Sequence, residues 1–366
     1  MQANAGPLSG VRVVEFSGIG PGPHCAMLLS DLGAEILRVD RPGGNGWPNP
    51  IVDRGRHAME IDVRGKAGRE LVLEAIDRAD VLIEGYRPGV MERLGFGPDE
   101  LLGRNPRLVY GRMTGWGQAG PLAQAAGHDI NYIALTGALA AITDGKRPVP
   151  PLNLVGDFGG GSLYLAFGIV AALLERERSG KGQVVDAAIV DGTASLMAMF
   201  AGWLANGNFS LDPDSNFLGG QAPFYRCYEC ADGKYVSIGA VEEKFYTELL
   251  NRIDAGDQLR TGQNKNALWA DRRDRFATIF KQRTRDEWCA ILEGSDACFA
   301  PVLTYEESIS HPQLAARGTY VEVDGIAQAA PAPRFSRTPG VIKPRGDGMT
   351  LLQRWLKTDV SAESKS

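Results

Sequence analysis

The N-terminal forty residues constrain the fold most, because two apolar runs flank a Gly-rich turn and a short helical segment. Residues 8–16 read as a buried strand, residues 17–23 form the turn, a helix runs from about 24 to 32, and residues 35–40 form a second strand that ends in Asp40. A strand, a helix and a strand in this order indicate a βαβ unit. Such a unit predicts a parallel sheet.

The following segments repeat this alternation. Residues 66–79 have helical periodicity, residues 81–84 form a buried strand, residues 98–103 a short helix and residues 108–113 another strand. The first half is therefore predicted to be a doubly wound α/β domain. Further helices are expected at 129–137 and 162–178, and residues 183–186 are expected to lead into a third helix that continues to residue 204.

A change in composition marks a boundary between two domains. Residues 206–220 are rich in Asn, Asp, Ser, Gly and Pro, as in a connector. Beyond it, two strand-like runs surround the turn Ala231-Asp232-Gly233, and helices are predicted at 242–253, 269–281 and 285–293. The expected division is a large domain of residues 1–205 completed by 330–366, a connector at 206–222, and a small α+β domain at 223–329 that includes the return connector.

Size, charge and cysteine content limit the classes of function. The 366 residues suggest two domains, and a net charge of −5 argues against nucleic acid or an anionic membrane as the main partner. We see no apolar run near the roughly 20 residues that a spanning helix needs, and no signal peptide in residues 1–7. Five cysteines are sparse for this length and fit reduced thiols. We therefore expect a cytoplasmic protein without a membrane partner.

Two short motifs are poor matches to cofactor or metal sites. In the turn Gly18-x-Gly20-x-Gly22 the third glycine is misplaced for a dinucleotide fingerprint, and the prolines within it lack N–H groups. A tight turn between strand and helix explains it as well. Cys227-x-x-Cys230 could be half of a metal site, but it lies in a predicted strand, where the two thiols point to opposite faces. We expect no metal and no separate cofactor.

Basic residues gather at the predicted strand ends of the first half. Ligands of open α/β sheets bind at the carboxyl ends of the strands. Any one of these side chains could be an ordinary surface residue, but together they favour a phosphorylated ligand. The group consists of Arg38, Arg41, Arg54, Arg56, Arg64, Lys66, Arg87, Arg93 and Arg112.

Two loops place ionisable side chains beside predicted helix starts. One contains His128 and the other contains Asp157, which three glycines follow. Backbone N–H groups at helix starts remain free to meet an anion. A lone histidine is usually only a polar residue, and Asp157 could be a plain N-cap. The glycines oppose that simpler interpretation, since each weakens the helix start by about 1 kcal/mol relative to alanine. Something is therefore expected to lie against the backbone there.

Several long segments carry a resemblance to a known family. They are GPLSGVRVVEFSGIGPGP, DLGAEILRVDRP, ADVLIEGYRPGVMERLG, YGRMTGWGQAGP, GHDINYIALTG, NLVGDFGGGSL, GKGQVVDAAIVDG, YECADGKY and APRFSRTP. In this order they make the chain similar, over nearly its whole length, to the family III CoA-transferases (CaiB/BaiF), and within them to the α-methylacyl-CoA racemase branch. The resemblance implies a large Rossmann-like domain, a smaller α+β domain, and a homodimer of two interlocked rings.

The resemblance also implies roles for individual residues. Transferases of the family have Tyr or Phe where His128 stands, whereas the racemases have His followed by Asp-Ile-Asn, as here. The racemase acid/base pair corresponds to His128 and Asp157, with Glu242 orienting and charging the histidine. The CoA nucleotide pocket corresponds to Arg41, Arg64, Tyr86, Arg87 and Arg93, although relatives have Lys in place of Arg64.

The resemblance predicts epimerisation of 2-methylacyl-CoA thioesters by proton transfer through an enolate, with CoA as part of the substrate. Two alternatives stay open, namely CoA transfer through an anhydride on Asp157 and a non-catalytic acyl-CoA-binding protein. An oxyanion would be stabilised by N–H groups at residues 157–160 or around Asp129. Leu196, Met197, Met199 and Phe200 either line the acyl channel or pack in the core.

Overall fold

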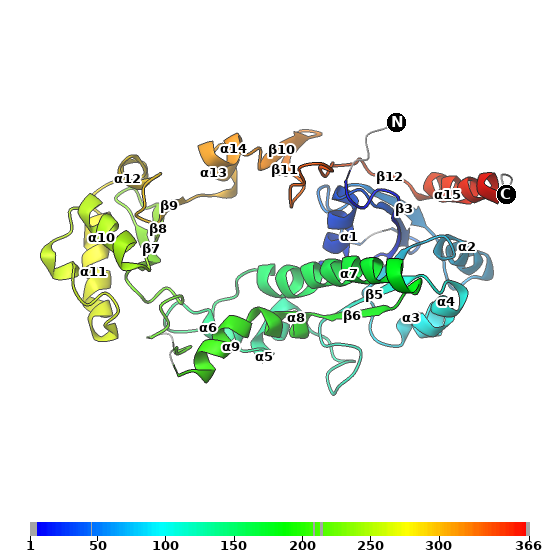
Figure 1. Cartoon of the computed structure of the whole chain (residues 1–366), viewed down its shortest axis with the longest axis horizontal. Coiled ribbons are helices and arrows are strands. Elements are labelled where there is room, and N and C mark those ends of the chain that lie inside the picture. Colours follow the sequence, from blue (N-terminus) through cyan, green and yellow to red (C-terminus); the bar gives the residue numbers. More distant parts are fainter. Residues whose placement is uncertain (1–5, 45, 208, 213–214, 364–366) are drawn as a thin grey trace. The chain divides into compact units, whose positions relative to one another are not determined.

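The computed structural model describes residues 6–44, 46–207, 209–212 and 215–363, without the side chains from 358 onward. The chain forms two compact units, which are traced by sequence colour in Figure 1. The first comprises Met1–Thr136, Pro151–Met197 and Val321–Ser366, and the second comprises Gly137–Pro150 and Ala198–Tyr320. The predicted large domain, residues 1–205 completed by 330–366, differs from the first unit in two ways. Gly137–Pro150 belongs to the second unit, and the later changes between units fall after Met197 and before Val321.

The first unit consists of a parallel sheet and the helices that cover it. Its elements are β1 (Arg12–Phe16), α1 (Pro21–Asp31), β2 (Glu35–Asp40), β3 (Arg56–Glu60), α2 (Lys66–Ile76), β4 (Val81–Glu84), α3 (Val90–Leu94), α4 (Pro98–Arg104), β5 (Val109–Thr114), α5 (Asp129–Leu135), the π-helix η1 (Leu154–Ser162), α7 (Leu163–Ser179), β6 (Val184–Ala188), α8 (Ile189–Leu196), β12 (Gly346–Asp347) and α15 (Gly348–Glu363).

The sheet has the strand order β12-β3-β2-β1-β4-β5-β6, and its strand pairs are parallel. From β1 the chain proceeds outward through β2 to β3, and then returns to the other side of β1 with β4. The order therefore reverses between β1 and β4, which is where open α/β sheets form a crevice at the carboxyl ends of their strands. The predicted α/β class with a parallel sheet is confirmed.

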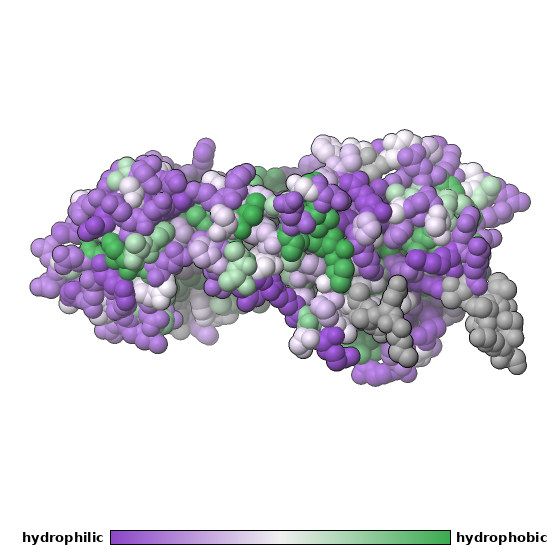
Figure 2. All heavy atoms as spheres, turned by 90° about the horizontal axis from the view of Figure 1, so that it is seen from above, coloured by the Kyte–Doolittle hydropathy of each residue, from purple (hydrophilic) through white to green (hydrophobic). Residues whose placement is uncertain are grey.

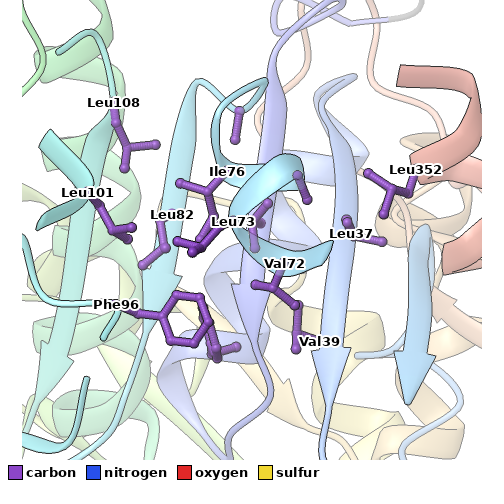
Figure 3. Close-up of a cluster of buried hydrophobic side chains, with 14 of the residues drawn as sticks. Leu37, Val39, Val72, Leu73, Ile76, Leu82, Phe96, Leu101, Leu108 and Leu352 are labelled. Carbon is purple, nitrogen blue, oxygen red and sulfur yellow. The ribbon is translucent and has the colours of Figure 1, made fainter. Parts of the chain in front are cut away.

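Alternate residues of each strand supply two cores on opposite faces of the sheet. Val14, Leu37 and Leu82 face α2 and α15, and Figure 3 shows Leu37, Val39 and Leu82 beside α2 residues such as Val72 and Ile76. Val13, Ile36, Val81 and Val109 instead pack with α1 and α7. Successive strand side chains point to opposite faces. The central strands β1, β2 and β4 are therefore buried on both faces, as is typical of a sheet covered on both sides.

A buried group of charges joins β1, β2 and β3. Arg56 pairs with Glu15 at 2.5 Å and with Asp53, and Arg38 pairs with Asp40 at 2.9 Å and with Asp53 at 3.0 Å. These five side chains are almost fully buried. Burial raises the pKa of Glu15, an effect that the neighbouring Arg56 opposes. The ion pairs thus hold the segment before β3 against the strand ends.

The π-helix η1 continues directly into α7, and together they form an apolar helix of 26 residues. By length and composition alone this helix could cross a membrane, although the sequence analysis found no such run. This is weak evidence, because core helices of soluble proteins pass the same test. Here α7 packs against β5 and β6.

The second unit contains a three-stranded antiparallel sheet and several helices. Its elements are α6 (Ala138–Ala141), α9 (Ala198–Ala205), β7 (Tyr225–Glu229), β8 (Tyr235–Gly239), α10 (Glu243–Arg252), the 3₁₀ helices η2 (Asp257–Leu259) and η3 (Asn266–Leu268), α11 (Trp269–Phe280), α12 (Arg285–Leu292), β9 (Phe299–Val302), α13 (Tyr305–Ile309) and α14 (Pro312–Ala316). The short strands β10 (Tyr320–Val323) and β11 (Ile326–Ala329) pair at the return to the first unit.

The predicted hairpin is present, since β7 and β8 pair antiparallel around Asp232. The prediction for residues 183–204 is partly wrong. Residues 184–188 form the strand β6, and the helical segment that follows is divided into α8 and α9. Because β6 is an edge strand, its first residues are exposed and it lacks the buried run that identifies a central strand.

The buried ion group predicts a large loss of stability when Arg56 is removed. Arg56→Ala leaves the carboxylates of Glu15 and Asp53 buried without that partner, and breaking a buried pair typically costs about 3 to 5 kcal/mol. Chemical denaturation should therefore show a much lower midpoint. Arg107→Ala is the matched control, because Arg107 forms an exposed pair with Glu177. Equal midpoints for the two variants would contradict this role of Arg56.

Candidate active site

A cavity of about 750 Å³ lies at the carboxyl ends of the strands, where the strand order reverses. Residues directly after β1, including the turn from Gly18 to Pro23, form one wall, and Glu84 and Gly85 at the end of β4 form another. Further lining residues follow β5 and β6. His128 and Asp157 both line this cavity. The structure thus brings together the two residues that the sequence analysis singled out, which are 29 positions apart in the chain.

His128 precedes α5 at its N-cap position, with extended backbone. Its N–H donates to Asn131 Oδ1 at 3.1 Å, and its carbonyl accepts from the Asn131 N–H at 2.8 Å. These two bonds fix the backbone from which the imidazole projects, and the residue is exposed. In the sequence His-Asp-Ile-Asn, the asparagine therefore positions the histidine.

Asp157 lies in the first half of η1 and is half-buried. Burial raises the pKa of its carboxyl, the negative charge of Asp129 raises it further, and the amide of Asn153 and the charge of His128 oppose the increase. Asn153 Nδ2 donates to Asp157 Oδ2 at 3.2 Å. Gly20, with φ of 69°, lies so close that an added Cβ would come within 3.2 Å of the same oxygen. A carboxyl with a raised pKa is a stronger proton acceptor than an exposed aspartate, as a general base requires.

Asp129 connects the two helix starts, a role that the sequence analysis missed. Its Oδ2 accepts the backbone N–H of Asp157 at 2.6 Å. Asp129 is 7% exposed, and among the described residues its Oδ1 has no hydrogen-bond partner. Only glycine fits at position 156, since a Cβ there would lie 2.3 Å from Asp129 Oδ2. Two features of the sequence could have pointed to this contact. One is an acidic residue, Asp129, in the first turn of a helix, and the other is Gly156 directly before Asp157.

The glycines after Asp157 are explained by packing against protein. A Cβ at Gly160 would lie 2.5 Å from Thr193 Oγ1, and a Cβ at Gly161 would lie 3.0 Å from Ile189. Both partners belong to α8, which packs closely on η1. The sequence analysis expected something to lie against this backbone, and at these two positions it is α8. Single π-helical turns often occur at functional sites.

A second cavity of about 310 Å³ lies beyond β2 and β3. Arg41, Arg64 and Tyr86 line it, together with apolar side chains such as Val63 and Leu94. Arg64 is exposed and pairs with Asp62 at 2.9 Å. Arg87 and Arg93 are also exposed, but they are not among the lining residues of this cavity. The structure therefore brings together three of the five predicted nucleotide-binding residues here.

Four of the arginines that were taken together as evidence for a phosphorylated ligand are buried in ion pairs instead. Arg38 and Arg56 belong to the group around Asp53. Arg54 pairs with Asp31 at 2.5 Å, and Arg112 joins Glu84 on β4 to Glu92 on α3, at 2.9 Å each. These guanidinium groups stabilise the fold. The interpretation of them as ligand-binding residues is wrong, because the sequence does not reveal their acidic partners.

The remaining motifs are accounted for by local structure. Gly20 precedes α1 and Pro21 is its first residue, so the Gly-rich turn is a tight connection of strand and helix. Asp40 pairs with Arg38. Cys227 is exposed on β7, whereas Cys230 is buried and lies one residue beyond the end of that strand. The prediction had placed both cysteines in one strand. Among the described residues no group of three or more His, Cys, Asp or Glu is arranged to hold a metal ion.

The other predicted site residues lie elsewhere. Glu242 belongs to the second unit, where it is the exposed N-cap residue of α10, so its action on His128 stays a prediction. Leu196 and Met199 are 46% and 50% exposed. Simple core packing therefore does not explain these two side chains, whereas Met197 and Phe200 are partly buried.

The sequence of the chain matches a known protein family over most of its length. A family model described as CoA-transferase family III matches residues 8–346, and the chain belongs to this family. The predicted family membership is confirmed.

Within the family, the chain is similar to proteins named alpha-methylacyl-CoA racemase. It is 43% identical to the one from Mus musculus over 93% of this chain and 89% of that protein, and 41% identical to the one from Homo sapiens over 91% and 88%. Among solved structures, a CaiB/BaiF family protein from Brucella suis is 26% identical with a TM-score of 0.81, covering 96% of this chain and 100% of that chain. The likeness thus extends over both units.

Proposed function

We propose that this protein is a racemase that inverts the α-carbon of 2-methylacyl-CoA thioesters. The observation that carries the proposal is the placement of His128 and Asp157 on one cavity at the switch point of the sheet. Its identity of 41% to 43% with proteins named alpha-methylacyl-CoA racemase supports the same conclusion. The His-Asp-Ile-Asn sequence at residues 128–131 agrees with the racemase branch.

The reaction begins when a base removes the α-proton. The C–H bond breaks, and its electron pair moves into the thioester carbonyl to give an enolate. The enolate oxygen needs hydrogen-bond donors that are already in place. The N–H of Asp157 is taken by Asp129 and that of Phe158 by the Asn153 carbonyl. The start of η1 is therefore a weaker candidate than the first turn of α5, where the N–H groups of Asp129 and Ile130 precede the first intrahelical bonds.

The second half of the reaction returns a proton to the other face of the same carbon. The carbonyl re-forms as the acid releases its proton, so that one proton leaves the substrate and one is gained. In our proposal, His128 and Asp157 flank this carbon and share one proton between them. The raised pKa of Asp157 fits this role, because a carboxyl of ordinary pKa would seldom be protonated at neutral pH.

The second cavity is proposed to hold the nucleotide part of CoA. Arg41 and Arg64 supply positive charge and Tyr86 a flat ring on its wall. Arg87 and Arg93 would contact phosphates from outside this cavity. The thioester carries its own CoA, so the mechanism requires neither a separate cofactor nor a metal. A cytoplasmic location is also proposed, and the five free thiols support it.

A transferase is the second candidate, because Asp157 lies on the cavity and its carboxylate could attack a thioester to form an anhydride. Trapping with hydroxylamine in the presence of an acyl-CoA and a free acid distinguishes it, since only an anhydride yields the hydroxamate of Asp157. A third candidate, an acyl-CoA-binding protein, would bind the ester without isotope exchange.

A homodimer is also proposed, because α7 has a row of exposed apolar side chains. Leu163, Phe167, Val170 and Leu174 follow one another at spacings of four, three and four residues, so they share one face, and Phe167 is 72% exposed. Figure 2 shows apolar groups among the hydrophilic surface of the face that it draws. Contiguous exposed apolar surface of this kind usually marks an interface. The implied occupant is a second copy of the chain, in the interlocked arrangement that the resemblance predicts.

We expect that His128→Ala and Asp157→Ala each abolish exchange of the α-proton with deuterated water for the epimer whose proton that residue removes, because each variant lacks the base for one face of the carbon. Proton NMR of a 2-methylacyl-CoA ester measures the exchange, and calorimetry should show that both variants still bind the ester. His311→Ala is the matched control, since His311 lies in the second unit and pairs with Glu293. Full exchange of both epimers in either site variant would remove that residue from the mechanism.

Arg41→Ala should raise KM for acyl-CoA by about tenfold with little change in kcat, as expected when one charge-assisted contact to a phosphate is lost. An acyl-pantetheine substrate without the nucleotide provides the decisive comparison. Its KM should be the same for wild type and variant. If the variant affects both substrates equally, the second cavity does not hold the nucleotide.

Phe167→Asp should convert the dimer to a monomer at micromolar concentration, because a charge on the apolar face of α7 must then be buried at the interface. Sedimentation velocity measures the change in mass. Arg178→Asp, at the exposed end of the same helix, should leave the dimer intact. A monomeric wild-type protein would exclude the proposed assembly.

A further inference from the structure

We infer that Asp129 is a positioning residue that fixes the spacing of the two proton-transferring side chains and supplies a fixed negative charge beside Asp157. The inference rests on the proposed racemase function and adds to it a third carboxylate that does not touch the reacting carbon. The sequence resemblance assigned no role to this side chain.

The geometry ties the two helix starts to each other through one side chain. Asp129 is the first residue of α5 and follows His128 directly, and its Oδ2 accepts the N–H of Asp157 in η1 at 2.6 Å. Any shift of α5 relative to η1 therefore stretches this bond. A misplacement of about 1 Å in an active site can cost on the order of 100-fold in rate. The contact thus transmits the position of one catalytic residue to the other.

The surroundings of Asp129 are built for this contact. The side chain is 7% exposed, and position 156 must be glycine because a Cβ there would lie 2.3 Å from the accepting oxygen. Burying a carboxylate is costly unless its oxygens accept hydrogen bonds. Here one oxygen is paired and the other, Oδ1, has no partner among the described residues. A buried group that is only half satisfied is unfavourable for stability, which indicates a role other than holding the fold together.

The charge of Asp129 also acts on the proton affinity of Asp157. Burial is the main reason that the pKa of Asp157 is raised, and Asp129 adds to it while His128 opposes it. The elements packed on η1 carry further titratable groups, of which Tyr132 is coupled to Asp157, because the charge of Asp157 raises the pKa of this tyrosine. They include His24 and Asp31 of α1, Tyr132 of α5, Tyr164 of α7, Asp191 of α8, Arg112 of β5 and Asp186 of β6. Asp129 is thus a neighbouring negative charge that adds to the effect of burial on the pKa of Asp157.

Two variants separate the hydrogen bond from the charge. Asp129→Asn keeps an oxygen that can accept from the Asp157 N–H but removes the charge, whereas Asp129→Ala removes both. For Asp129→Ala we expect kcat to fall about 10- to 100-fold with KM changed less than about threefold, because ground-state binding does not depend on the contact. Asp129→Asn should retain most of the kcat, and the limb of its pH–rate profile that Asp157 controls should move to lower pH.

The sign of that shift follows from the charge. A neighbouring negative charge disfavours ionisation of Asp157, so removing it lowers the pKa. Carbon-13 NMR of labelled aspartate carboxyls measures this pKa without turnover, and the Asp157 signal is assigned by its loss in Asp157→Asn. The NMR titration should shift downward in Asp129→Asn. The matched control is Thr193→Val, because the Thr193 hydroxyl is also buried against η1 and has no hydrogen-bond partner in the described part of the chain. It should change neither kcat nor the titration.

The outcomes separate the two proposals. If wild type shows no α-proton exchange on any 2-methylacyl-CoA ester, the proposed function fails, and the NMR titration still tests Asp129. If Asp129→Asn leaves the pKa of Asp157 unchanged and Asp129→Ala keeps the wild-type kcat, the inference about Asp129 is overturned while the racemase proposal stands. Should Asp129→Ala fail to fold, the isosteric Asp129→Asn decides through the titration alone.

Discussion

One hydrogen bond, from the Asp157 N–H to the Asp129 carboxylate, connects the two helix starts on which the candidate site is built. It is charge-assisted, and such bonds are shorter and stronger than those between neutral groups. The sheet topology and the helix packing around this bond position Asp129 and Asp157. The reversal of strand order between β1 and β4 creates the crevice, and the packing of η1 on α8 brings Asp157 to its wall. The close approach of Gly160 to Thr193 makes this packing possible, and Gly156 allows η1 to approach Asp129 on α5.

The same region illustrates how a protein allocates its charges. Arginine can hold a phosphate or a carboxylate equally well, and two arginines at the strand ends of this sheet have very different surroundings. Arg38 is buried with Asp40 and Asp53, while Arg41, three residues later, is exposed on the wall of a cavity. The first keeps the loop before β3 in place, and the second is free to meet a ligand. Burial and partners decide between these uses.

Much of the fold could be predicted from the sequence where local signals were strong. The strands at 35–40 and 81–84 were placed correctly, because each contains adjacent apolar residues, and the hairpin around Asp232 was found from its turn. The strands β3 and β6 were missed. The first, Arg-His-Ala-Met-Glu, carries a buried arginine whose partners lie far away in the chain, and the second is an edge strand with exposed residues.

In the candidate site too, residues with a local sequence signal were predicted, and residues that depend on distant contacts were not. His128 and Asp157 were found because each stands beside a helix start in an unusual loop, and the structure brings them to one cavity. Asp129 was not singled out, because its importance depends on a contact across 28 residues that no local pattern reveals. The buried arginines were misread for the same reason. Pairing between distant residues is the information that a single sequence lacks.

The central claim is that an imidazole and a carboxyl act on opposite faces of one carbon. The most direct test incubates wild-type protein with a single pure epimer of a 2-methylacyl-CoA ester in deuterium oxide and follows both epimers by NMR. The account predicts that the opposite epimer forms from either starting epimer, carrying one deuterium at the α-carbon. Retention of the starting configuration with no deuterium, while the acyl-CoA binds or its CoA passes to another acid, would contradict it.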